Sequence, residues 1–318
     1  MSRETEKILK ELQQFLALHG DEATDEQSVD RLTNQFLAEY GGYPKSRKNV
    51  DPETADDYLE LAEQASSKRK CLEYLRKAVE LDPANVDAQL QLILHTLEDK
   101  PDEQLPAFQK LIAAAAKPLE QEGCFQEDMG DFWTILETRP YMRVRHAYFD
   151  ALISCGMMRR AIDEGEELLK LCENDNLGVR YQLMHLYAYM EDELHALALH
   201  KRYDSYEETQ MLLPLAVLYY KLNQFDRSKD YIRRLAAVNK DTKKFFRAAA
   251  GNDLDQYLMD MDPYGYRPFT MDELLEELVA SSYLFASVPC FFRWASGSLR
   301  TQTSAGKRKA AQKSRPDL

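Results

Sequence analysis

Small side chains recur at nearly regular intervals along this chain, and their recurrence constrains the fold more than any other feature. The recurring residues are Cys71, Ala107, Ala161, Ala196 and Ser228, and the intervals between them are 36, 54, 35 and 32 residues. After Cys71, a large apolar residue follows at the fourth position (Leu75) and Ala at the seventh (Ala78). A small side chain lets two helices approach closely, and the apolar residue one turn later wedges against a neighbouring helix. The pattern predicts a series of helix pairs.

Other residues of each repeat fit the same interpretation. Pro83 follows the second helix of the first pair and stops it, so that the chain can reverse. About 20 extra residues between Gly123 and Pro140 explain the long interval, because the remaining intervals lie near one period. Apolar residues at helical spacing precede each later small residue: Leu94 and Leu97, Tyr148 and Leu152, Leu183 and Tyr187, Leu215 and Tyr219. We therefore expect five hairpins.

Over residues 55–240 the sequence resembles the tetratricopeptide repeat (TPR) family, whose period is about 34 residues. The best match runs from Tyr148 to Leu171, with Gly156 at the turn between the helices and Ala161 opening the second helix. Residues 137–143, followed by the Asn174-Asp175-Asn176 run, are similar to uncharacterised bacterial TPR-containing proteins. The resemblance implies an all-α fold, a right-handed α-solenoid of about five hairpins whose first helices line a concave side.

The flanks of the repeats differ from them in pattern. Residues 1–50 predict N-terminal capping helices, residues 51–240 the solenoid with an insertion near 121–140, and residues 241–295 a C-terminal helical extension. In that extension, Thr270 and Glu273 indicate a capping box, and residues 285–294 a short aromatic helix. Residues 296–318, with six basic residues and few apolar ones, are expected to form a basic disordered tail.

Composition and charge restrict the classes of function. Only 12 Gly and 12 Pro among 318 residues favour long helices, and no segment approaches about 18 consecutive uncharged apolar residues, as a membrane span requires. We expect a cytoplasmic protein without a membrane partner, whose five cysteines are reduced thiols. The net charge is -13, with +5 on the tail from residue 296 and -18 on the remainder. Nucleic acid is therefore not an expected partner.

No pattern of residues predicts catalysis or a cofactor. The sequence lacks the glycine-rich phosphate-binding motifs, the paired-histidine zinc motif and the serine nucleophile motif. His195 and His200 are five residues apart and diverge around a helix, so a metal site is not expected. We interpret the acidic runs as solvated helix faces. The protein is predicted not to be an enzyme and to carry no cofactor.

The TPR resemblance places a set of polar and aromatic side chains on the concave side. These expected groove residues are Arg143, His146, Asp150, Tyr181, His185, Tyr189, Tyr220 and Lys221, with Leu213 between them. Tyrosines offer rigid contact area with a hydroxyl group, although each one can instead pack between helices. Arg143 and Lys221 are candidates to clamp a carboxylate.

These observations predict a non-catalytic scaffold that binds a protein or peptide in the concave groove. The alternative is a peptide-responsive transcriptional regulator, in which residues 4–40 would form the DNA-binding domain. That segment has more acidic than basic residues, which disfavours a recognition helix. The sequence does not predict the partner, the pathway or the oligomeric state.

Overall fold

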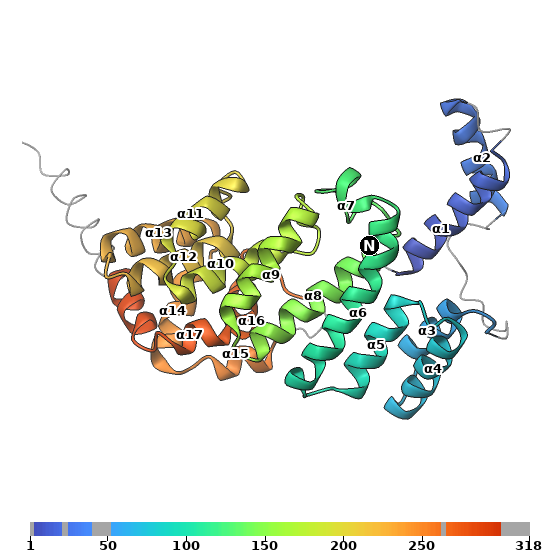
Figure 1. Cartoon of the computed structure of the whole chain (residues 1–318). Helices are drawn as coiled ribbons and strands as arrows, with labels where there is room; N and C mark the ends of the chain where they lie inside the picture. Colours follow the sequence, from blue (N-terminus) through green and yellow to red (C-terminus); the bar gives the residue numbers. More distant parts are fainter. Residues whose placement is uncertain (1–2, 21–24, 40–51, 262–264, 300–318) are drawn as a thin grey trace, which may run out of the picture. The chain divides into compact units, whose positions relative to one another are not determined.

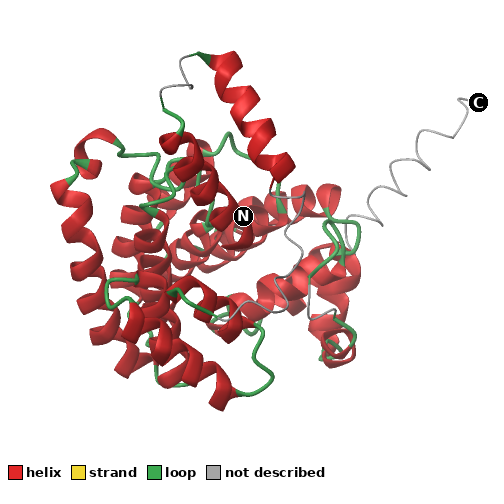
Figure 2. Ribbon diagram, turned by 90° about the vertical axis from the view of Figure 1, so that its right-hand side faces the viewer, coloured by secondary structure: helices red, strands yellow, loops and turns green. Residues whose placement is uncertain are grey.

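The computed structural model describes residues 3–20, 25–39, 52–261 and 265–299. Helices and loops make up these residues (Figure 2), apart from two isolated bridges that pair Gly130 and Asp131 with Cys172. The expected all-α class is confirmed. The tail from residue 300 lies outside the described residues.

The chain divides into two compact units, which are described separately. The first unit comprises Met1–Cys155 and Leu171–Glu173, and the second comprises Gly156–Lys170 and Asn174–Leu318. The helices of the first unit are α1 (Arg3–Leu18), α2 (Glu26–Glu39), α3 (Ala55–Glu63), α4 (Lys68–Leu81), α5 (Val86–Thr96), α6 (Pro101–Gln121), α7 (Cys124–Glu127) and α8 (Arg139–Ser154). The second unit holds α9 (Met158–Leu171, whose last residue belongs to the first unit), α10 (Val179–Met190), α11 (Glu193–Arg202), α12 (Thr209–Lys221), α13 (Phe225–Val238), α14 (Thr242–Gly251), α15 (Asp255–Met259), α16 (Met271–Ala280), α17 (Ser282–Ala286) and a helical segment at 291–299.

In the first unit, helices that follow one another in sequence pack together. The helix α3 packs on α4, α4 on α5, α5 on α6, and α6 on α8 (Figure 1). A capping box starts α3, where the Thr54 side chain accepts the Asp57 N–H and the Asp57 side chain accepts the Thr54 N–H. Fully buried Ala78 and Ala88 belong to the core that joins α3, α4 and α5. Small residues at these positions permit the close helix contacts that the spacing predicts.

In the second unit, α12 is the central helix. It contacts α10, α11, α13 and α16, and all of its residues from Thr209 to Tyr219 are buried. A helix that is apolar around its whole circumference must be covered on all sides. The Ser228 hydroxyl of α13 donates a 2.6 Å hydrogen bond to the Ala216 carbonyl, which satisfies a buried polar group where the two helices cross.

The predicted small positions are buried in four of the five cases. Four of them, Cys71, Ala161, Ala196 and Ser228, lie in the core. Ala107 is only half-buried, and Ala114, the alanine seven residues after it, is exposed. The buried face of α6 instead consists of Leu105, Phe108, Leu111, Ala115 and Leu119. The predicted phase of this helix was therefore wrong, because the run of four alanines at 113–116 does not define which of them faces inward.

The flanking segments differ from expectation in three respects. The pair α1 and α2 packs together but makes no extensive contact with α3 or α4 among the described residues, so the expected cap on the first hairpin is not formed there. Thr270 begins α16 as predicted, yet Glu273 accepts the Phe269 N–H rather than completing a capping box. Residues 296–299 continue a helix and bury Leu299, so the predicted disordered tail does not begin at residue 296.

Candidate functional site

Arg143 on α8 is the predicted groove residue with the most extensive ionic contacts. Its Nε and Nη2 atoms donate to the two carboxylate oxygens of Asp87, at 2.8 and 2.6 Å, and its Nη1 donates to both oxygens of Glu6, at 3.0 Å each. Burial lowers the pKa of the Arg143 guanidinium, but the hydrogen bonds and charges of Asp87 and Glu6 outweigh burial and leave this pKa raised. Arg143 was predicted as a groove residue that could clamp a carboxylate of a ligand, and in the structure its donors are occupied by two carboxylates of the chain itself.

A second arginine, Arg139, faces the same carboxylate from one turn earlier on α8. Its Nη1 lies 3.2 Å from Oε1 of Glu6, and its Nε donates to the Trp133 carbonyl at 2.7 Å. The Arg139 guanidinium also lies 5.4 Å from the centre of the Trp133 ring. Glu6 and Arg139 have only 5% and 4% of their surface exposed. We call Arg139, Arg143, Asp87 and Glu6 the α8 carboxylate site.

Two further predicted residues of the first unit form a local pair. Nδ1 of His146 lies 3.2 Å from Oδ2 of Asp150, one turn further along α8, and both side chains are partly exposed. The ring of His146 packs on Phe149. This pair is a contact within one helix and does not extend the carboxylate site.

Tyr181 of α10 lies in a polar cluster of the second unit. Its hydroxyl donates to Glu208 at 3.1 Å and accepts a hydrogen bond from Arg180, whose guanidinium lies 4.3 Å from the ring centre. Burial is the main cause that raises the pKa of Tyr181 to about 12, and the nearby Glu208 carboxylate adds to it. The hydroxyl therefore stays protonated and acts as a hydrogen-bond donor.

His185, one turn further along α10, is almost completely buried. Its Nδ1 donates to the Tyr181 carbonyl at 2.8 Å, which assigns the ring proton of the neutral imidazole to Nδ1. Its Nε2 lies 3.2 Å from Oε2 of Glu277 on α16, in a geometry that falls short of a hydrogen bond, and no other described residue bonds to this nitrogen. This histidine is a core residue and does not line an open groove.

Two of the remaining predicted residues, Tyr189 and Tyr220, pack against the C-terminal helical segments. Tyr189 packs edge-on against Tyr283 of α17, and Tyr220 packs against Phe291 and Trp294, at ring distances of 5.5, 5.3 and 5.0 Å. The Lys221 ammonium donates to the Ala188 and Tyr189 carbonyls at the end of α10. Leu213 is fully buried.

The predicted groove residues are divided between the two units. Arg143, His146 and Asp150 belong to the first unit, whereas the tyrosines, His185 and Lys221 belong to the second. In the second unit, α16, α17 and residues 291–299 occupy the face that was expected to be open. The aromatic residues at 285–294 were the sequence signal for this covering, since they need an apolar surface to pack on.

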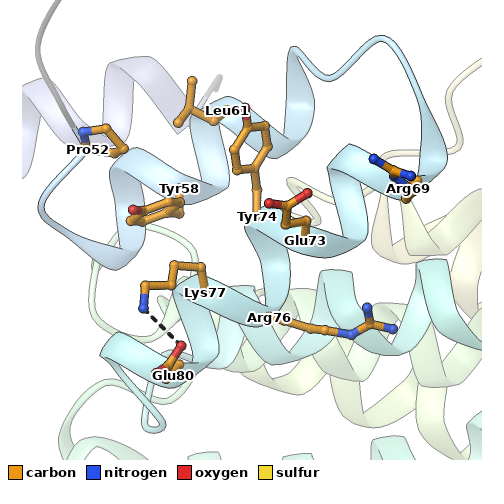
Figure 3. Close-up of a pocket in the computed structure, with 9 residues that line it drawn as sticks. All are labelled: Pro52, Tyr58, Leu61, Arg69, Glu73, Tyr74, Arg76, Lys77 and Glu80. Atoms are coloured by element: carbon orange, nitrogen blue, oxygen red, sulfur yellow. Dashed lines mark hydrogen bonds and ion pairs between the residues drawn. The ribbon is translucent and has the colours of Figure 1, made fainter.

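A surface depression that the sequence reasoning missed lies on the first hairpin (Figure 3). It has a volume of about 740 Å³. Its lining residues are Pro52, Tyr58, Leu61, Arg69, Glu73, Tyr74, Arg76, Lys77 and Glu80, which come from α3, α4 and the segment before them. The rings of Tyr58 and Tyr74 lie 6.3 Å apart and tilted. We call this surface the α3–α4 depression.

The polar groups around this depression are largely unengaged by the protein. Lys77 pairs with Glu80 at 3.0 Å. Among the described residues, the guanidinium groups of Arg69 and Arg76 make no hydrogen bond or ion pair. The hydroxyl groups of Tyr58 and Tyr74 make no hydrogen bond in that part of the chain either. Figure 3 shows the two arginines at the end of the depression away from Pro52. The surface thus combines aromatic area with cationic and hydroxyl donors.

The described ranges contain no group of three or more His, Cys, Asp or Glu side chains placed to hold a metal ion. Among those same ranges, no helix has both the length and the apolar character needed to span a membrane.

Comparison with known proteins gives no relative from which a function could be taken. No protein-family model matches the sequence, and no curated protein matches it.

Proposed function

We propose that this protein is a non-catalytic scaffold of TPR-like helical hairpins that binds a segment of another protein. The proposal is supported by the consecutive packing of α3 with α4, α5 with α6, α10 with α11 and α12 with α13. It is also supported by the buried small residues near the 34-residue period. In this proposal the hairpins stack as a solenoid, and function depends on surfaces that the stack presents.

The observation that carries the proposal is the α3–α4 depression. Tyrosine side chains bring contact area with little loss of conformational entropy on binding, and they are enriched at protein recognition sites. Here Tyr58 and Tyr74 line a depression in which the two guanidinium groups have no hydrogen-bond or ion-pair partner among the described residues. A ligand can therefore gain hydrogen bonds without breaking existing ones.

The charge of the depression indicates the kind of segment that fits. Three cations, Arg69, Arg76 and Lys77, face two carboxylates, those of Glu73 and Glu80, on a chain whose net charge is -13. Because Lys77 is already paired with Glu80, the unmatched charge resides on the arginines. Arginine binds carboxylates with two parallel hydrogen bonds. We infer a peptide segment that carries an acidic residue beside an apolar one.

A selection from a displayed peptide library on the full chain tests this proposal. Selected peptides should contain acidic and apolar residues, and their affinity should fall about tenfold or more for the double variant Arg69→Ala and Arg76→Ala, through loss of charge-assisted hydrogen bonds. The matched control is Lys110→Ala with Lys117→Ala, which removes the same charge from exposed positions of α6. Equal binding by both variants, or no enriched peptides, would refute this assignment.

A further inference from the structure

The α8 carboxylate site holds a helix by a single acidic side chain. Glu6 of α1 receives hydrogen bonds from both Arg139 and Arg143. Its side chain is 7% exposed, and those of the two arginines are 5% and 17% exposed. Such burial exceeds that of the other ion pairs of the first unit, for example Lys68 with Glu98, where both partners are more than half exposed. The contact is thus a largely buried ion pair and not a surface ion pair.

The four charges of the site balance only while Glu6 is present. Asp87 belongs to α5 and accepts two hydrogen bonds from Arg143, one at each carboxylate oxygen. Glu6 supplies the second negative charge that two guanidinium groups require. If α1 leaves, one buried cation stays unneutralised, which is costly in a partly desolvated position. The site therefore selects for another carboxylate in place of Glu6.

Among the described residues, the helix that α1 contacts most is α2. In this contact, Phe15 and Phe36 meet at 5.6 Å. Leu18 of α1 and Leu37 of α2 remain 84% and 47% exposed. Apolar burial scales with the area removed from water, so these two leucines contribute little to holding the helices. The hydrogen bonds of Glu6 to Arg139 and Arg143 are a specific link between α1 and α8.

We propose that the α8 carboxylate site is a second interaction surface, which accepts a helix of a partner protein through an acidic side chain, and that α1 occupies it as an exchangeable internal ligand. The partner helix places a carboxylate between Arg139 and Arg143, in the position of Glu6. This surface extends the proposed binding function to α8, and it uses none of the residues of the α3–α4 depression. Either proposal can therefore fail without the other.

The proposal is tested by asking whether α1, added as a separate peptide, binds to the α8 carboxylate site of the full chain. The probe is a fluorescently labelled peptide of residues 3–20, titrated into the full chain and followed by fluorescence polarisation. The wild-type chain should bind it weakly, because a tethered α1 competes at an effective concentration of about millimolar. The Glu6→Gln chain should bind it about tenfold more tightly or better, because its own α1 has lost the carboxylate.

Matched controls separate this mechanism from general loosening of the structure. Glu11→Gln removes the same charge from α1 at a side chain with no ion pair among the described residues, and it should bind as the wild type does. The labelled peptide that itself carries Glu6→Gln should not bind. Adding Arg143→Gln to the Glu6→Gln chain should abolish binding of the unmodified peptide while the circular dichroism spectrum stays helical.

Two results would overturn the proposal. Equal and weak binding by the wild-type, Glu6→Gln and Glu11→Gln chains, all folded, would mean that α1 is a fixed structural element. A wild-type dimer that becomes a monomer on Glu6→Gln substitution, measured by light scattering, would mean that the site accepts α1 of a second copy instead of a partner helix.

Discussion

Nε2 of His185 lies 3.2 Å from Oε2 of Glu277, and both side chains are buried. Burial lowers the pKa of His185 to about 4. Burial, with the added charges of Glu273 and Glu276, raises the pKa of Glu277 to about 8. The carboxyl group is therefore the protonated partner, and it faces the unprotonated Nε2 of a ring whose Nδ1 donates to Tyr181. Coupled groups such as these titrate as a pair.

This pair predicts a fall in stability between pH 6.5 and about 8. The unfolded chain loses the histidine proton near pH 6.5, whereas the folded pair keeps one proton until the pH passes the raised pKa of Glu277. The unfolded state then binds fewer protons, and the free energy of unfolding should fall by about 1.4 kcal/mol per pH unit, or about 2 kcal/mol in total. Between pH 4.5 and 6.5 both states carry one proton, so the contribution of the pair should be flat. Urea denaturation at a series of pH values from about 4.5 to about 8 measures this free energy of unfolding.

The control for this pH dependence is Glu277→Gln, which keeps the shape of the side chain and removes its proton. The difference in unfolding free energy between wild type and variant should fall steadily from about pH 4.5 to about pH 8, because over this range Glu277 keeps its proton in the folded chain and loses it in the unfolded chain. A difference that is independent of pH from about 5 to about 8 would contradict the raised pKa of Glu277.

Much of the fold could be predicted from the sequence, because helix pairs leave a spacing signal. The buried positions of Cys71, Ala161, Ala196 and Ser228 follow from the steric demand of close helix crossings. The same reasoning failed at Ala107, where consecutive alanines satisfy several phases equally.

The binding surface was much less predictable, for a physical reason. A tyrosine on a first helix has the same sequence pattern whether it faces water or another part of the chain. The covering of Tyr189 and Tyr220 was therefore indicated only by the aromatic residues at 285–294, not by the tyrosines themselves. Arg143 was predicted to bind a carboxylate, but Arg139, four residues earlier on the same helix face, was not recognised as its neighbour in an anion site. Their partner Glu6 is more than 130 residues away in sequence, and nothing local identifies it.

The buried polar network beside α16 predicts a large effect at Asn239. Its Nδ2 donates to the Thr270 carbonyl at 2.9 Å and to Glu273 at 3.1 Å, and the side chain is fully buried. Asn239→Ala should lower the free energy of unfolding by about 2 to 3 kcal/mol, because two buried acceptors lose a donor. Gln256→Ala, at an exposed amide of α15, is the control and should change it by less than about 0.5 kcal/mol. Chemical denaturation compares them, and equal effects would contradict the network.

The close crossing of α4 with its neighbours predicts that added volume at Ala78 is not tolerated. Ala78 is fully buried in the cluster that joins α3, α4 and α5. Ala78→Leu should lower the free energy of unfolding by about 1 to 3 kcal/mol through overpacking. Ala114→Leu makes the same chemical change at an exposed position of α6 and should be nearly neutral. If both variants unfold at the same denaturant concentration as wild type, the proposed role of the small residues is wrong.

The covering of α12 by residues 291–299 rests on aromatic packing, and Tyr220 is the residue through which to test it. Its ring contacts Phe225, Phe291 and Trp294 at centre distances of 5.7, 5.3 and 5.0 Å. Tyr220→Ala should free the segment locally, because such ring pairs contribute about 0.5 to 1.5 kcal/mol each beyond their buried area. The chain has two tryptophans, so a Trp133→Phe background leaves Trp294 as the reporter.

In that background, Tyr220→Ala should shift the Trp294 emission to longer wavelength and increase its quenching by acrylamide. The control Tyr206→Ala removes a ring that is 53% exposed and should leave both unchanged. If Trp294 emission is the same in both variants, residues 291–299 are held by other contacts. The next contact to test is then the Phe246–Phe291 ring pair, whose centres lie 5.7 Å apart. A shift confined to Tyr220→Ala would instead make this aromatic cluster the attachment that closes the expected groove of the second unit.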